Sequence, residues 1–226
     1  TPGAAGARNT GMLAADGELL ALCDDTDLWL PGKLRAQVEV LRADPEAELV
    51  TCGLRLFNDR MSAERSIPRT RITRAALLRG HIPQLHPSGF VARRRAVLDG
   101  IGLFSEHIPG SYGEDYEFLL RAAGRTPVRN LPLVGVDVRW HQGSHFSVIK
   151  NGPTISAAAR WLLDSYPELG AVRAGYAHWA GKVAFAEAVS GARGPAVRWA
   201  GRTMRRRPGD PRAVLALAVA CGVPPR

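Results

Sequence analysis

Apolar and polar residues follow one another along the first part of the chain with periods that predict helices and strands in turn. Small and apolar residues from 6 to 15 predict a helix that ends at Asp16-Gly17, and residues 18–23 predict a short buried strand. Helical spacing then predicts a helix between Pro31 and Asp44, and residues 47–57 return to a strand pattern. This order is typical of an α/β protein.

The middle of the chain continues the alternation after a break. Residues 58–71 are polar and charged and include Pro68, so we expect an excursion or a loop there. Further elements are predicted from turn residues and apolar runs: helices over 73–79, 94–98 and 113–124, and strands over 86–91 and 131–140.

After Pro153 the pattern changes to alanine-rich helices. They are predicted over 154–166, 168–190, 195–206 and 211–221, with Trp161, Trp179 and Trp199 as packing anchors. No apolar run reaches the roughly 20 residues that a membrane-spanning helix needs. We therefore expect an α/β domain over residues 1–150 and a helical C-terminal extension over 151–226.

Composition and charge narrow the class of partner. At 226 residues and 46% hydrophobic residues, the chain is long enough to bury a substantial core. The net charge of +9 comes almost wholly from arginine, and the basic residues are spread along the chain without the aromatic interleaving of a nucleic-acid motif. A partner that carries phosphate, such as a nucleotide sugar or an anionic membrane surface, explains this charge, and no specific nucleic acid is expected.

The cysteines and the start of the chain bear on location. Cys23, Cys52 and Cys221 form no CxxC pair and no disulfide framework, and no secretory signal is visible. We expect a cytoplasmic protein, with the inner face of the membrane as the alternative. The chain starts with Thr1 and runs directly into a helix, which predicts a fragment that lacks its N-terminal portion.

The most informative cluster is acidic. Asp24, Asp25 and Asp27 directly follow the predicted strand 18–23, and carboxylates this close repel one another unless a cation or solvent compensates them. Mg²⁺ or Mn²⁺ suits such oxygen ligands best. The alternative is a solvated turn in which Asp27 caps the helix that follows Pro31.

A second acidic pair, Glu114 and Asp115, opens the predicted helix 113–124. In the alternating order of elements, both acidic groups fall at the edge of the sheet where open α/β folds bind ligands, so they could face one cleft. The alternative is that the pair only stabilises the helix dipole, by about 0.3–1 kcal/mol.

Taken in order, these pieces resemble the family-2 glycosyltransferases of the GT-A fold. The resemblance runs from about residue 6 to 147 and rests on these motifs: Ala7-Arg8-Asn9-Thr10-Gly11, Ala14-Ala15-Asp16-Gly17-Glu18, Asp24 to Pro31 with Gly32-Lys33-Leu34, His86-Pro87-Ser88, Ile101-Gly102-Leu103-Phe104-Ser105-Glu106, and Gly113-Glu114-Asp115-Tyr116-Glu117-Phe118-Leu119-Leu120-Arg121. It implies a Rossmann-like mixed sheet flanked by helices, truncated at its N-terminus and followed by an α-helical appendage.

The resemblance also implies an activity. The family transfers a sugar, with inversion, from a nucleoside-diphosphate sugar to an acceptor hydroxyl, here in glycan, cell-envelope or glycolipid biosynthesis. Asp115 would be the general base, and Glu114 would orient a loop or an acceptor hydroxyl. The acceptor would be a glycan or a lipid-linked molecule, with peripheral contact to a membrane.

The remaining roles follow from the same resemblance. The usual second acid of the family's DxD motif falls on Thr26, so either Asp25 or Asp27 supplies the missing ligand or metal dependence is weakened. The resemblance implies that Arg8, Asn9, Asp24 and Asp25 bind the donor and its nucleotide. It implies that Asp25, Asp27 and His141 bind Mg²⁺ or Mn²⁺, and that His86 and Ser88 lie on the acceptor side.

Two other functions compete with this hypothesis. A metal-dependent nucleotidyl or phosphoryl transferase would also position phosphates with paired carboxylates, although no glycine-rich phosphate loop supports it. A non-catalytic, arginine-rich module that binds anions would use the acids only as helix caps and surface charge.

Overall fold

The computed structural model describes residues 3–58, 60–139 and 148–225, and it divides into two compact units. The first comprises residues 1–74, 82–105 and 115–141, and the second comprises residues 75–81, 106–114 and 142–226. The boundary predicted at residue 150 stays a prediction. No helix of the described residues is both long and apolar enough to cross a membrane.

A mixed sheet forms the first unit. Its strands are β1 (Leu19–Ala21), β2 (Asp27–Trp29), β3 (Leu49–Phe57), β4 (Ser62–Arg65), β5 (Arg71–Ile72), β6 (Val91–Arg93) and β7 (Val128–Arg139). The order across the sheet is β1-β6-β3-β7-β2, with β4 paired to β3 and β5 paired to β7. Only β3 and β7 are parallel, and the other pairs are antiparallel.

The two long central strands approach each other closely around a bulge in their register. A Cβ atom on Gly53 of β3 would lie 2.9 Å from the carbonyl oxygen of Leu133 on β7 and 2.6 Å from that of Arg65. A side chain does not fit there, so glycine is required where the ladder shifts. Beyond this shift, Val136 to Val138 of β7 pair with β2, which begins at Asp27 of the acidic cluster.

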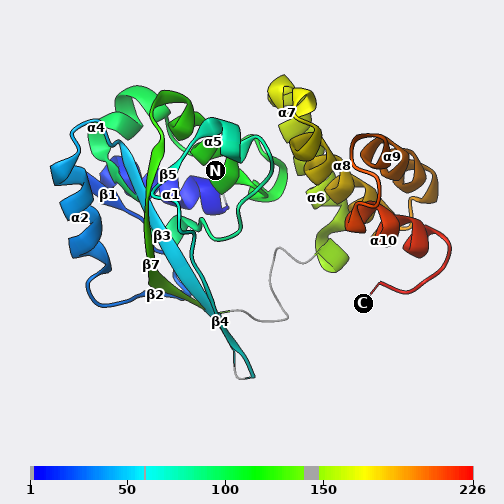
Figure 1. Cartoon of the computed structure of the whole chain (residues 1–226), viewed down its shortest axis with the longest axis horizontal. Helices are drawn as coiled ribbons and strands as arrows, with labels where there is room; N and C mark the ends of the chain where they lie inside the picture. Colours follow the sequence, from blue (N-terminus) through cyan, green and yellow to red (C-terminus); the bar gives the residue numbers. More distant parts are fainter. Residues whose placement is uncertain (1–2, 59, 140–147, 226) are drawn as a thin grey trace. The chain divides into compact units, whose positions relative to one another are not determined.

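Helices cover both faces of this sheet (Figure 1). On one face, Leu41 of α2 (Lys33–Ala43) is buried in a cluster with Val50 and Val91. On the other, Phe118 of α5 (Glu114–Arg125) stacks on Phe90 and Phe104 at ring-centroid distances of 6.3 and 4.4 Å. The remaining helical segments of the first unit are α1 (Ala4–Ala14), α4 (Arg94–Ala96) with a π turn at Val97–Ile101, and a short 3-10 turn at Pro87–Gly89. The second unit contains most of α3 (Arg74–Leu77) and a short 3-10 turn at Pro109–Ser111.

The second unit consists mainly of helices. They are α6 (Val148–Ser165), α7 (Pro167–Ala171), α8 (Arg173–Val189), α9 (Arg193–Arg206) and α10 (Pro211–Ala220). Buried alanines such as Ala184, Ala200 and Ala216 let α8, α9 and α10 pack closely, and Trp179 is fully buried as the sequence predicts. The predicted helix 168–190 is two helices, because Val172 adopts an extended conformation between α7 and α8.

Three local predictions differ from the structure. No strand is predicted between residues 23 and 47, yet Asp27 begins strand β2 by pairing with Val138. The described part of the predicted loop 58–71 contains β4 and the start of β5. The strand predicted over 86–91 begins only at Val91, because the residues before it form a 3-10 turn. Short strands of this kind are fixed by their partners and carry little periodicity of their own.

Candidate active site

The acidic cluster occupies the turn between β1 and β2. The backbone N–H of Asp27 donates to the carbonyl oxygen of Asp24 at 3.0 Å, which closes the turn. Asp24 is half-buried, Asp25 is exposed and Asp27 is only 7% exposed. Asp27 does not cap the helix after Pro31, since Gly32 precedes α2 with a φ of 85° and no side chain caps that end. The capping alternative is therefore wrong.

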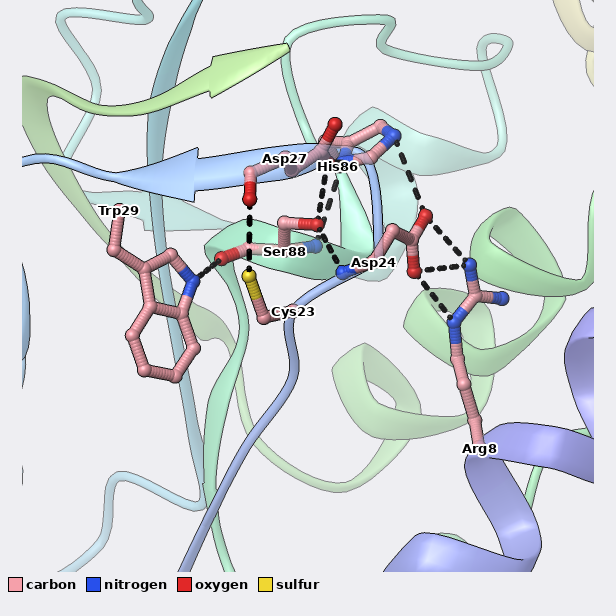
Figure 2. Close-up of polar contacts among 7 residues, drawn as sticks. All are labelled: Arg8, Cys23, Asp24, Asp27, Trp29, His86 and Ser88. Atoms are coloured by element: carbon pink, nitrogen blue, oxygen red, sulfur yellow. Dashed lines mark hydrogen bonds and ion pairs between the residues drawn. The ribbon is translucent and has the colours of Figure 1, made fainter.

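Ser88 makes hydrogen bonds to both Asp24 and Asp27 (Figure 2). It is fully buried in the 3-10 turn before β6. Its Oγ accepts a hydrogen bond from the backbone N–H of Asp24 at 2.9 Å and donates one to Oδ2 of Asp27 at 2.6 Å. One hydroxyl therefore fixes both the backbone at Asp24 and the rotamer of Asp27.

The turn that carries Ser88 is itself held from two sides. Trp29 of β2 donates its indole N–H to the carbonyl oxygen of Ser88 at 2.8 Å (Figure 2). From α2, the buried Gln37 donates to the carbonyl oxygen of Gly89 at 2.6 Å. These bonds satisfy carbonyl groups that the short 3-10 turn leaves unpaired, so the position of Ser88 depends on contacts from distant segments.

His86 lies against both carboxylates. Its Nδ1 is 3.3 Å from Oδ2 of Asp27, and its Nε2 is 3.9 Å from Oδ2 of Asp24. The backbone N–H of Ser88 donates to Nδ1 at 3.4 Å. Asp24, Asp27 and His86 each offer a ligand atom, and these atoms lie within 4.8 Å of one another. Two carboxylates and an imidazole at this spacing could hold a divalent cation.

Arg8 of α1 supplies positive charge to the cluster. Its guanidinium binds Asp24 through both carboxylate oxygens, with Nη2–Oδ1 and Nη2–Oδ2 distances of 2.8 and 3.0 Å. The guanidinium also lies 5.4 Å from the ring centroid of Phe104. The next residue, Asn9, is buried and exchanges two hydrogen bonds with the backbone of Phe104, at 2.9 and 2.8 Å. Asn9 thus orients α1, and with it Arg8.

Burial changes the protonation of two groups in this region. Burial raises the pKa of the Asp27 carboxyl above its ordinary value, while the hydrogen bond from Ser88 and the nearby His86 act in the opposite direction. Burial lowers the pKa of Lys33 from 10.5 to about 8. The Lys33 Nζ lies 4.3 Å from the ring centroid of Trp29, so the aromatic face partly compensates the buried charge.

The other predicted site residues lie in different environments. Asp25 is exposed and does not join the Asp24, Asp27 and His86 group. Glu114 is buried at the start of α5. The half-buried Asp115 accepts a hydrogen bond from the backbone N–H of Tyr116 at 2.7 Å, as expected of a carboxylate in the first turn of a helix. His141 lies outside the described residues, so its metal role stays a prediction.

A family model described as glycosyl transferase family 2 matches residues 1–101. Over these residues the chain is similar to glycosyl transferase family 2. The matched residues include Arg8, the acidic turn, His86 and Ser88, so all of these side chains lie within the match. The resemblance to this family that the motifs predict is confirmed.

One similar curated protein is the uncharacterized glycosyltransferase YwdF of Bacillus subtilis (strain 168). It is 29% identical over 136 residues, which cover 58% of this chain and 48% of that protein. The chain therefore spans about half the length of this relative.

Two solved structures share the fold. TarS 1-349 of S. aureus is 12% identical with a TM-score of 0.53, over 91% of this chain and 71% of that one. The mannosyltransferase PcManGT of Pyrobaculum calidifontis, solved in complex with GDP-Man and Mn²⁺, is 19% identical with a TM-score of 0.50, over 98% of this chain and 66% of that one. The predicted GT-A fold, with a mixed sheet flanked by helices and a helical C-terminal region, is confirmed.

Sequence reasoning missed the residues that hold the turn. Gln37 and Trp29 look like ordinary positions of an amphipathic helix and a short apolar run, and Lys33 looks like a solvated helix charge. The available signal was the indole N–H of Trp29, because a tryptophan in a buried setting usually donates to a specific acceptor.

Proposed function

We propose that this protein is an inverting glycosyltransferase that moves a sugar from a nucleoside-diphosphate sugar to an acceptor hydroxyl. The observation that carries the proposal is that ligand atoms of Asp24, Asp27 and His86 lie within 4.8 Å of one another, in the part of the chain that matches the family 2 model. The mannosyltransferase that shares the fold was solved with GDP-Man and Mn²⁺, which supports a nucleotide sugar as the class of donor.

The side chains present fit a divalent metal. Asp27 is a buried carboxylate whose pKa is raised by burial, and it lies beside a second carboxylate, so a cation here relieves both desolvation and repulsion. We propose Mn²⁺ or Mg²⁺ held by Asp24, Asp27 and His86. When bound, such an ion neutralises the negative charge that grows on a departing diphosphate.

The chain's own residues then have separate tasks. Ser88 holds the Asp27 carboxylate in place, and Arg8 fixes Asp24 through its bidentate contact. Asp115 is proposed as the general base, with Glu114 orienting the acceptor side. In the transfer, the acceptor oxygen forms a bond to the anomeric carbon, the bond from that carbon to the diphosphate breaks, and the acceptor proton passes to Asp115.

The acceptor is proposed to be a glycan or a lipid-linked molecule of cell-envelope or glycolipid biosynthesis. The excess of basic side chains favours an acceptor close to anionic groups, and a lipid-linked acceptor implies peripheral contact with a membrane. We propose that the reaction takes place in the cytoplasm, on the ground of the three scattered cysteines, or at the inner face of the membrane, on the ground of the basic charge.

The test is a turnover assay with a panel of nucleoside-diphosphate sugars, with Mn²⁺ or with a chelator, in which release of the nucleoside diphosphate is followed by chromatography. We expect metal-dependent release from one donor class, and loss of release in Asp27→Asn. Asp25→Asn is the matched control, because it removes the same charge from an exposed neighbour.

The products separate this proposal from its rival. Release of a nucleoside diphosphate with transfer of the sugar supports a glycosyltransferase. Release of inorganic pyrophosphate from nucleoside triphosphates, with no sugar transfer, would instead assign the cluster to a nucleotidyl transferase.

A further inference from the structure

The two parts of the chain differ sharply in charge balance. Residues 1–141 contain 18 arginines and lysines and 17 acidic residues, whereas residues 142–226 contain 12 and 4. A uniform preference for arginine would raise the basic count in both parts alike. The two parts differ mainly in the number of acidic residues, which is low in residues 142–226. This segment forms most of the second unit and therefore carries nearly all of the net charge.

Helix α9 concentrates this charge on one face. Ala196, Ala200 and Thr203 are buried toward the other helices of the unit. On the opposite side of the helix, Arg198, Arg202 and Arg205 recur at helical spacing and are exposed. The helix contains no acidic residue, and α9 therefore presents an uncompensated arginine surface.

Helices α9 and α10 also carry exposed aliphatic side chains. Val197 of α9 is 49% exposed, and Val214 and Leu215 of the neighbouring α10 are 48% and 52% exposed. Basic side chains beside exposed aliphatic ones are typical of helices that lie in the interface of a bilayer, where the apolar groups enter the acyl region and the guanidinium groups meet phosphates.

The same region is poorly suited to single-stranded nucleic acid. Stacking of bases needs an accessible aromatic face. The half-buried Trp199 of α9 has the guanidinium groups of Arg202 and Arg160 at 4.7 and 5.5 Å from its ring centroid, and Arg206 lies 5.2 Å from that of Tyr176. Arginine side chains therefore cover the faces of these aromatic rings. The exposed aliphatic side chains favour lipid over nucleic acid as the partner.

We propose that the exposed face of α9, with Val214 and Leu215 of α10, binds the surface of an anionic phospholipid membrane. Each arginine near such a surface strengthens binding about fivefold, so three of them account for a factor of about 100. The proposed membrane binding does not depend on the proposed function. Its consequence, that the enzyme meets a lipid-linked acceptor at the membrane, rests on that function.

The experiment is co-sedimentation of the full chain with vesicles of phosphatidylcholine, with and without phosphatidylglycerol. We expect binding only to the vesicles that contain phosphatidylglycerol. The triple variant Arg198→Gln/Arg202→Gln/Arg205→Gln should bind about 100-fold more weakly, and the corresponding triple lysine variant should retain most of the binding.

The matched control is Arg35→Gln/Arg42→Gln/Arg65→Gln, which removes the same charge from exposed positions of the first unit. Equal weakening in this control would overturn the proposal, because binding would then reflect net charge alone. Absence of vesicle binding would also overturn it. So would a triple glutamine variant that loses binding to an oligonucleotide while its binding to vesicles is unchanged.

Turnover with a soluble acceptor in the absence of vesicles separates the two proposals. We expect the α9 glutamine variant to retain wild-type turnover there. If the wild-type protein binds vesicles but shows no turnover with any donor, the proposed function is wrong and the membrane-binding proposal is still supported.

Discussion

Ser88 is the residue on which the geometry of the acidic turn depends most. The substitution Ser88→Ala removes one hydroxyl from a fully buried position and changes little volume. It leaves the backbone N–H of Asp24 without its acceptor, and it removes a hydrogen bond to the Asp27 carboxylate. An unsatisfied buried group costs about 1–3 kcal/mol and a bond to a charged group contributes about 1.5–3 kcal/mol, so we expect the free energy of unfolding to fall by about 2.5–6 kcal/mol.

The same substitution should weaken the metal site. The Ser88 hydroxyl lowers the pKa of Asp27, so its loss raises that pKa further and frees the carboxylate to rotate. Removing a partner that orients a metal ligand typically costs about 10–100-fold in affinity. We expect a loss of Mn²⁺ affinity in that range by calorimetric titration, together with a lower midpoint of thermal unfolding.

The control for Ser88→Ala is Ser62→Ala, at an exposed position of β4. It should leave both quantities unchanged. If Ser88→Ala unfolded at the wild-type temperature and bound Mn²⁺ with wild-type affinity, the hydroxyl would not organise the turn, and the reasoning from its two hydrogen bonds would be refuted.

Three further predictions concern other parts of the site. The pKa of Lys33 is about 8 in the folded chain and 10.5 ordinarily, so the unfolded state binds more protons between these values and the stability of the wild type rises with pH there. Measured by urea titration, the unfolding free energy of the wild type minus that of Lys33→Met should rise by up to about 3 kcal/mol from pH 8 to 10.5, and a constant value would contradict this prediction. Asn9→Leu removes two hydrogen bonds to the backbone of Phe104, so the amide of Phe104 should exchange hydrogen faster, and unchanged protection would exclude a bridging role. Asp115→Asn should abolish sugar transfer while leaving the dissociation constant for the nucleoside diphosphate nearly unchanged, and normal turnover would remove Asp115 from the role of base.

The elements of the α/β unit could be predicted from sequence because their periodicity is local. Helix α2 and strand β3 each bury a continuous apolar pattern, and the structure places them within a few residues of the predicted bounds. Strand β2 has three residues and no pattern of its own. It exists because Asp27, Leu28 and Trp29 pair with β7, a partner more than 100 residues away that local periodicity does not reveal.

The site was predictable in its residues but not in its contacts. His86 was assigned to the acceptor side, and the structure places it against Asp24 and Asp27 because β1 and β6 pair in the sheet. That pairing is continued by a bond from the N–H of Leu22 to the carbonyl oxygen of Phe90. Lys33 was not singled out, since a charged residue at the start of a helix is normally solvated. Its burial beside Trp29 depends on tertiary packing alone.

The most direct test of the central claim is calorimetric titration of the protein with nucleoside diphosphates in the presence and absence of Mn²⁺. The measurement compares wild type with Asp27→Asn, His86→Ala and the exposed-site control Asp25→Asn. We predict Mn²⁺-dependent binding that the first two substitutions weaken and the control leaves intact. Binding that needs no metal, or that Asp25→Asn weakens while Asp27→Asn and His86→Ala do not, would contradict the assignment of this cluster as the metal site of a glycosyltransferase.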